Sequence, residues 1–171
     1  MVARVSRYRF PPEGLSAVVA EIRAAVHANP RGYDRRIQAA FLFAHRESGD
    51  AVALTVASER DALDHAPAEP PAAILEEVQD YDVTEVAVSS PPEGVHMFAV
   101  LAPFRLGDPA GRRPAFDDQV RAGFLLESEK TGSALRIAVG EDPEALRGTG
   151  AAPDARRYEM EYLLLHDALR S

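Results

Sequence analysis

Polar side chains suited to orienting a small ligand lie on three short stretches in the first third of the chain. A guanidinium, hydroxyl groups and an amide can each hydrogen bond to a ligand oxygen, and the alanines between them leave volume for an apolar body. The candidate ligand-binding residues are Arg4, Ser6, Tyr8, Gln38, Ala40, Leu42, Thr55 and Ala57. This chemistry is typical of a pocket for a small, mostly apolar compound, and none of these residues is assigned a catalytic role.

Other residue types that support catalysis are scattered or missing. Cysteine is absent, which excludes thiol catalysis, thiolate metal ligands and disulfides. No glycine-rich phosphate loop and no nucleophilic serine motif is found. The histidines never stand at ligand spacing on a predicted helix; they are His27, His45, His65, His96 and His166. We therefore expect no metal site and no bound cofactor.

Composition restricts the class of partner. The 171 residues carry a net charge of −8 and form no basic cluster beyond arginine pairs, which argues against nucleic acid as a partner. The longest mostly apolar run, residues 95–104, is too short to cross a bilayer, and the N-terminus lacks the apolar core of a secretory signal. We expect a soluble, cytoplasmic protein with no membrane partner. With 46% apolar residues it can form a core without metals or disulfides.

The candidate residues belong to a segment that recurs later in the chain. Residues 33–63 align without a gap with residues 116–146, at a fixed offset of 83. Identical pairs include Asp34 with Asp117, Phe41 with Phe124, and Gly49 with Gly132. A fixed offset of this length indicates two copies of one supersecondary unit.

The first copy predicts the element order βαββαβ, which is the ferredoxin-like order. Alternation predicts a strand over residues 2–10, with Arg4, Ser6 and Tyr8 on one face. An apolar stripe predicts a helix over residues 15–28, formed by Leu15, Val18, Val19, Ile22 and Val26. A hairpin follows, with strands at 35–45 and 51–57 and a turn at 47–50. A short helix then begins at Ser58, a second helix covers residues 72–79, and a strand covers residues 81–90.

The second copy is shorter. Residues 95–106 read as a strand because they contain Pro103; the alternative is a helix, since Pro91-Pro92-Glu93-Gly94 repeats Pro11-Pro12-Glu13-Gly14. Only a short loop follows, which leaves no room for a counterpart of the first helix. Hairpin strands are predicted at 121–127 and 134–139, a helix start at 142–144, and a closing strand at 157–165. The predicted division is 1–90 for the first ferredoxin-like unit and 91–171 for the second, degenerate one.

Cross-strand pairing predicts the two faces of the first hairpin. A turn at residues 47–50 would place Ala44 opposite Ala53, Leu42 opposite Thr55, and Ala40 opposite Ala57. One face is then bulky and apolar, with Phe41, Phe43, Leu54 and Val56. The other is small, which indicates either close packing by a helix or space for a ligand.

In the second copy the small face gains charge. Gln38, Ala44 and Ala53 are replaced by Arg121, Glu127 and Arg136, respectively. The same pairing would place Glu127 opposite Arg136 as a surface ion pair. Alternatively, Arg121 and Arg136 could together bind an anion. A face that carries charges is not expected to be covered by an apolar helix. This agrees with the absence of a predicted counterpart of the first helix in the second copy.

Three segments resemble the antibiotic biosynthesis monooxygenase-like family. They are residues 1–8 (MVARVSRY), 40–55 (AFLFAHRESGDAVALT) and 58–63 (SERDAL). The resemblance implies an α+β fold in which two ferredoxin-like units form a dimeric α/β barrel, here as a pseudo-dimer within one chain that could also form a homodimer. It further implies a ligand pocket under the helices on the small face.

The same resemblance implies a function. Members include cofactor-independent monooxygenases that act on an aromatic polyketide or quinol, and the alternative is a non-catalytic small-molecule-binding or interaction protein on the same fold. Several members carry a tryptophan where this chain has Ala57 and Gly140, and this chain has no tryptophan. Haem-degrading members use a histidine about ten residues after that position, whereas His65 follows it by about eight, on roughly the opposite side of a helix.

Overall fold

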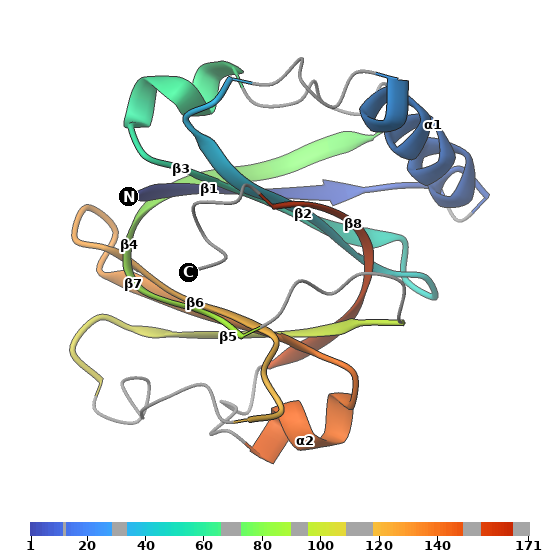
Figure 1. Cartoon of the computed structure of the whole chain (residues 1–171). Helices are drawn as coiled ribbons and strands as arrows, with labels where there is room; N and C mark the ends of the chain where they lie inside the picture. The colour runs from blue at the N-terminus through green and yellow to red at the C-terminus, as the bar shows by residue number, and fades with distance from the viewer. Residues whose placement is uncertain are drawn as a thin grey trace. The chain divides into compact units, whose positions relative to one another are not determined.

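The fold divides into two compact units. The computed structural model describes residues 1–11, 13–28, 34–65, 73–89, 96–108, 118–148 and 155–165 (Figure 1). Unit 1 comprises Met1–Asp80 with Met160–His166, and unit 2 comprises Tyr81–Glu159 with Asp167–Ser171. The boundary therefore falls inside two strands, β4 (Ile74–Val88) and β8 (Arg156–Leu165). The division into 1–90 and 91–171 stays a prediction.

The sheet of unit 1 is centred on three antiparallel strands. β3 (Asp50–Ala57) lies between β1 (Val2–Arg9) and β2 (Ile37–His45), and the sequence predicts each of these three strands. The first part of β4 follows β1 in strand order, and the last part of β8 follows β2. The bulky face is a packed core, in which Phe43, Leu54 and Val56 are fully buried. Phe41 and Phe43 stack with their ring centroids 5.5 Å apart.

The predicted pairing of the first hairpin is wrong by two residues. Ala44 pairs with Ala51, Leu42 with Ala53, and Ala40 with Thr55. The turn occupies residues 46–49 instead of 47–50, and Asp50 already belongs to β3. Because side chains alternate with a period of two, a shift of two keeps every residue on its predicted face. A β-bulge between Ile37 and Ala39 then displaces Gln38 from the regular ladder.

The tight turn of this hairpin depends on Gly49. Its φ of 74° lies in the left-handed region, and its carbonyl accepts a hydrogen bond from the Phe10 backbone N–H at 2.9 Å. A Cβ at this position would lie 2.4 Å from the Phe10 carbonyl oxygen. Its counterpart Gly132 also has a positive φ, 64°, but no atom lies within 4 Å of the corresponding Cβ position.

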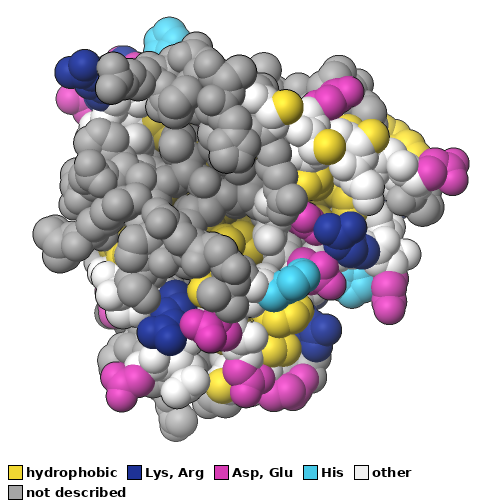
Figure 2. All heavy atoms as spheres, turned by 45° about the vertical axis from the view of Figure 1, so that its right-hand side comes forward, with side chains coloured by type: hydrophobic (Ala, Val, Ile, Leu, Met, Phe, Trp, Pro, Cys, Tyr) yellow, Lys and Arg dark blue, Asp and Glu magenta, His cyan; other side chains and the backbone are white. Residues whose placement is uncertain are grey.

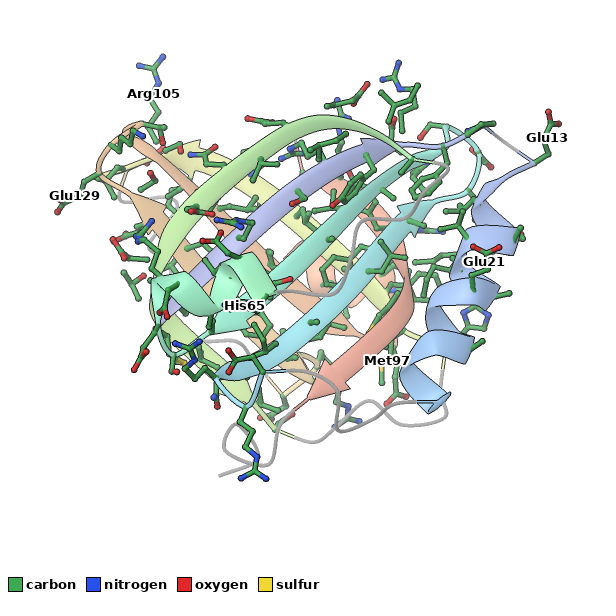
Figure 3. The ribbon with its side chains drawn as sticks, turned by 90° about the horizontal axis from the view of Figure 1, so that it is seen from above. Glu13, Glu21, His65, Met97, Arg105 and Glu129 are labelled. Atoms are coloured by element: carbon green, nitrogen blue, oxygen red, sulfur yellow. The ribbon has the colours of Figure 1, made fainter. Side chains whose placement is uncertain are left out.

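Two helical elements cover the small face of unit 1. α1 (Leu15–Ala28) packs Leu15, Val18 and Val19 onto one end of that face, as its apolar stripe predicts; the side chains of Ile22 and Val26 lie outside the described part. The 3₁₀ helix η1 (Arg60–His65) packs Ala62 and Leu63 onto the other end. Figure 3 looks onto this face, with η1 at His65 and α1 at Glu21 on either side of the strands.

The predicted helix over residues 72–79 is wrong, because Ile74–Val88 forms the single long strand β4. Its first part carries acidic residues that form ion pairs with arginines of β1. Glu77 Oε2 lies 3.2 Å from Arg7 Nε, and Asp80 Oδ1 lies 2.8 Å from Arg4 Nε. These contacts and the strand ladder outweigh the modest helix propensity of the local sequence.

The sheet of unit 2 contains β5 (Phe98–Arg105), β7 (Ser133–Gly140) and β6 (Ala122–Ser128) in that order. β5 confirms the strand interpretation of residues 95–106 and overturns the helical alternative; Pro103 lies within it, opposite Leu135. The helix start at residues 142–144 is confirmed as α2 (Pro143–Gly148), where Asp142 Oδ1 accepts a hydrogen bond from the Glu144 N–H at 2.9 Å. Among the described residues between β5 and β6, none is helical.

The elements of the two units correspond along the chain. β3 and β7 begin and end 83 residues apart, as do η1 and α2. The hairpins share one register, since Leu125 pairs with Arg136 just as Leu42 pairs with Ala53. In both units the described hairpin leads into a helical element.

The fold class predicted from the sequence, α+β, is confirmed. All described strand pairs are antiparallel, and the described helices are few. Among the described residues, no helix has the length and apolar character needed to span a bilayer.

Candidate functional site

The candidate site lies on the small face of unit 1, between α1 and η1. Tyr8 and Leu42 pack against α1, while Ala57 packs against η1. Between these two covers lies a strip of buried small residues, Ser6, Ala40 and Thr55, which are 7%, 5% and 9% exposed. Thr55 is the centre of the strip, because it pairs with Arg4 on β1 and with Ala40 on β2.

The structure therefore brings together seven of the eight predicted residues on one face. Gln38 is the exception. It lies at the bulge, and its side-chain amide donates to the carbonyls of Arg35 and Arg36, each at 3.4 Å. Its hydrogen bonds thus return to its own segment and not to the strip.

Arg4 closes the end of the strip next to η1. Nε and Nη2 donate to the two carboxylate oxygens of Asp80 at 2.8 and 3.2 Å, and Nη1 donates to Asp64 at 3.0 Å and to the Leu63 carbonyl at 3.2 Å. The hydrogen bond to Asp80 raises the pKa of the Arg4 guanidinium above its ordinary value, against the lowering effect of burial, and Asp64 raises it further. Arg4 is therefore a permanent cation that ties η1 to β1 and β4.

A second arginine fixes the other end of η1. Arg36 donates to Asp34 Oδ2 at 2.7 Å, to Glu59 Oε2 at 3.2 Å and to Asp61 Oδ2 at 2.5 Å. Hydrogen bonds from Arg36 lower the pKa of Asp34 to about 2 and also lower the pKa of Asp61. Sequence reasoning missed this role, because Arg36 lies 23 residues from Glu59 and 25 residues from Asp61 in the chain.

Replacing Arg36 with methionine tests this anchor by its pH dependence. The folded pKa of Asp34 is depressed, so its contribution to stability is present above its ordinary pKa of 3.8 and is lost as the pH falls towards 2. We expect Arg36→Met to lower Tm at pH 7, and the difference from the wild type to shrink below about pH 4.

Arg121→Met is the matched control for this experiment. Arg121 forms an ion pair with Glu141 at 3.2 Å, and both side chains are exposed. Its Tm change should therefore be smaller. A Tm difference for Arg36→Met that is the same at pH 7 and pH 3 would contradict the anchor.

Unit 1 also holds a buried carboxylate that sequence reasoning did not single out. Glu161 on β8 has a side chain that is 3% exposed, and its Oε1 lies 2.5 Å from Arg46 Nη2. No sequence signal could have found this pair, because it depends on β8 lying next to β2.

The corresponding face of unit 2 is built differently. Leu146 of α2 packs against Val100, Val120 and Ala138 there. Arg136 is only 7% exposed, and it stands opposite Leu125, while Glu127 stands opposite Ala134. The predicted cross-strand pairing of Glu127 with Arg136 is wrong, because this hairpin has the same two-residue shift as the first.

The anion-binding alternative in unit 2 gains no support from Arg121. This residue precedes β6 instead of lying on it, and its guanidinium donates to Glu141 at 3.2 and 3.3 Å. Its charge is therefore engaged by a neighbouring carboxylate. The counterparts of Ala40 and Thr55 in unit 2 are Gly123 and Ala138, which pair with each other, and Ala138 packs against Leu146 of α2.

The chemistry of the strip favours binding and orientation. Its described side chains offer two hydroxyl groups beside a fixed guanidinium, which suits an aromatic body carrying a phenolic oxygen. In the described part of the chain, no group of three His, Asp or Glu side chains is arranged to hold a metal ion. His65 is exposed on η1, and Figure 3 shows it on the helix that covers the sheet.

Gly140 stands in unit 2 where several members of the resembled family carry a tryptophan, and the packing around it leaves no room for that side chain. A Cβ on Gly140 would already lie 2.5 Å from the Gln119 carbonyl oxygen. In unit 1 the position is filled by Ala57, which is fully buried against η1. Neither position therefore has room for an indole in this packing.

Comparisons with solved structures establish the fold. The chain is similar to a putative monooxygenase from Lactobacillus acidophilus (TM-score 0.68, 10% identity, 96% of this chain and 95% of that chain). It is also similar to one from Fusobacterium nucleatum (TM-score 0.67, 10% identity, 93% and 90%) and to an anthrone oxidase-like protein (TM-score 0.57, 11% identity, 95% and 92%). No family model and no curated protein sequence matches. The dimeric α/β barrel fold implied by the sequence resemblance is thus confirmed.

Proposed function

We propose that this protein is a cofactor-independent monooxygenase that oxidises a planar aromatic compound of the polyketide or quinol type. The observation that carries the proposal is the likeness, over nearly the whole of both chains, to putative monooxygenases and an anthrone oxidase-like protein. The buried strip of small residues in unit 1 supports it, since a flat apolar ligand requires such a surface.

The proposed reaction needs no external reductant. A substrate methylene flanked by aromatic rings reacts with dioxygen, so that one oxygen atom becomes the new carbonyl and the other leaves as water. The substrate supplies all the electrons. The hydroxyls of Ser6 and Thr55 would hydrogen bond to the phenolic oxygen, which becomes more negative as the methylene proton leaves. Arg4 is a positioning residue in this scheme, because its donors hold Asp64 and Asp80.

We also infer that the chain is a tandem repeat, two ferredoxin-like units forming an internal pseudo-dimer in which the second lacks its first helix. Support comes from the shared hairpin register and the constant spacing of 83 residues. A cytoplasmic location stays a prediction. In Figure 2, acidic and basic side chains are interspersed among the described residues, a distribution that offers little to a nucleic acid backbone.

Oxygen uptake by the purified protein tests the function. With anthrone as substrate, we expect uptake of one dioxygen per molecule oxidised, with no added flavin or haem and no inhibition by a metal chelator. If an anthraquinone binds but anthrone oxidation does not exceed the rate in buffer, the protein is a small-molecule-binding protein and the enzymatic proposal is wrong. If neither compound binds, the aromatic ligand is wrong as well.

A further inference from the structure

The first part of β4 borders the candidate site within unit 1. β4 follows β1 in strand order. Directly before the strand, Ala73 packs against the apolar cluster under α1. Six residues into the strand, Asp80 Oδ1 lies 2.8 Å from Arg4 Nε, and Asp80 Oδ2 lies 3.6 Å from Nη1 of Arg60 on η1. The residues between these contacts therefore run beside the strip, from the α1 cover to the η1 cover.

Two ion pairs fix how this part of β4 lies against β1. They join Arg4 to Asp80 and Arg7 to Glu77. Moving three residues forward along β1 thus moves three residues back along β4, as in an antiparallel pair, and this register brings Val78 beside Ser6. Because side chains alternate along both strands, Val78 shares the small face with Ser6, while Leu75 lies on the other face of β4.

Val78 is an open apolar side chain on a face that is otherwise well covered. It is 47% exposed, whereas Ser6 beside it is 7% exposed. Ala53, which pairs with Ser6 on the other side, is also only partly buried. Both helical covers pack elsewhere, α1 at Tyr8 and η1 at Ala57. Solvent therefore reaches the small face along the row that crosses β3, β1 and β4 between the two covers.

We propose that the site opens over this row and that Val78 packs against the far ring of the aromatic substrate, as a specificity-determining residue. The inference rests on the proposed function, since the occupant is its substrate. Adjacent strands lie about 4.8 Å apart, so Val78 stands about 10 Å from β3, a span that three fused rings can cover. A ligand whose oxygen meets the hydroxyls of Ser6 and Thr55 then extends its apolar end over β4. Val78 favours compounds long enough to reach it.

Two conservative variants test the contact through the Kd of a soluble anthraquinone sulfonate, measured by calorimetry. Isoleucine and threonine are β-branched like valine and suit a strand, and Val78 is half exposed, so Val78→Ile and Val78→Thr should both fold. Isoleucine adds a methylene to the contact, and threonine replaces a methyl with a hydroxyl. We expect the Kd to fall in Val78→Ile and to rise in Val78→Thr, each by up to about fourfold, the factor for one buried methylene.

Leu75→Thr is the matched control. Leu75 is 40% exposed on the same strand, three residues from Val78, but on the opposite face. Its replacement should leave the Kd of the anthraquinone sulfonate unchanged. Oxidation of anthrone by each variant is measured alongside, so that ligand contact and catalysis are read separately.

The order of the Kd values decides the outcome. Tighter binding in Val78→Ile and weaker binding in Val78→Thr, with no change in Leu75→Thr, supports the contact. If all variants bind alike, or Leu75→Thr changes the Kd as much as Val78→Thr does, the contact is wrong, and anthrone oxidation by the wild type still upholds the proposed function. The expected order without anthrone oxidation supports the contact and overturns the enzyme. A wild type that binds neither compound overturns both.

Discussion

Replacing Thr55 with valine is expected to lower kcat/KM for oxidation of the aromatic substrate by about 30-fold, which corresponds to the loss of a hydrogen bond of about 2 kcal/mol to a charged oxygen. Valine has nearly the same shape, so the sheet should stay packed. Thr55 is 9% exposed and lies at the centre of the strip, between Arg4 and Ala40. Steady-state kinetics with anthrone measures the effect.

Thr84→Val is the control, because Thr84 is an exposed threonine on β4 whose hydroxyl donates to the Leu125 carbonyl at 3.3 Å. It should leave kcat/KM unchanged. Wild-type kinetics in Thr55→Val would remove Thr55 from the site.

Gly49→Ala is expected to lower the free energy of unfolding by about 2–4 kcal/mol. Two costs add at this position. An alanine in the left-handed region is strained, and its Cβ would lie 2.4 Å from the backbone oxygen of Phe10. Because that oxygen belongs to the main chain, it cannot move aside as a flexible side chain could. Urea unfolding monitored by circular dichroism measures the change.

Gly132→Ala separates these two costs. Gly132 has a similar φ of 64° but no atom within 4 Å of the Cβ position, so only the backbone strain, about 1 kcal/mol, should remain. Equal losses in the two variants would show that the close approach of Phe10 to Gly49 contributes nothing to stability.

The faces of the hairpins could be predicted because they depend on alternation alone. Phe43 and Leu54 follow a period of two, and a shift of two residues in register leaves them on the same face. The register itself could not be predicted, since it depends on where the turn at residues 46–49 closes. That turn is set by local contacts, such as the hydrogen bond from Ser48 Oγ to Asp50 Oδ2 at 2.9 Å.

The strand predicted over residues 81–90 corresponds to the second part of β4, but the first part, residues 74–80, was missed because the residues that decide its structure are distant in sequence. Locally, residues 72–79 have a composition that suits a helix, whereas the neighbouring strand β1 favours the extended form through the strand ladder and through arginines that pair with Glu76 and Glu77. Non-local contacts of this kind override propensity. The strand β5, in contrast, was predictable because Pro103 disfavours a helix interior.

The candidate site was predictable in part for the same reasons. The face shared by Ser6, Ala40 and Thr55 follows from alternation, and the structure places these residues together. The attachment of Arg4 to Asp80 and the pairing of Arg46 with Glu161 join segments far apart in the chain. A single sequence carries no pattern that reports such pairs.

The most direct test of the central claim, that an aromatic ligand binds on the small face of unit 1, is a methyl NMR titration with a soluble anthraquinone sulfonate. The protein would carry labelled alanine and leucine methyl groups. We predict large shifts for Ala40, Leu42 and Ala57, and small ones for Leu125, Ala138 and Leu146 on the corresponding face of unit 2. Equal shifts on the two faces, or shifts confined to unit 2, would contradict the account.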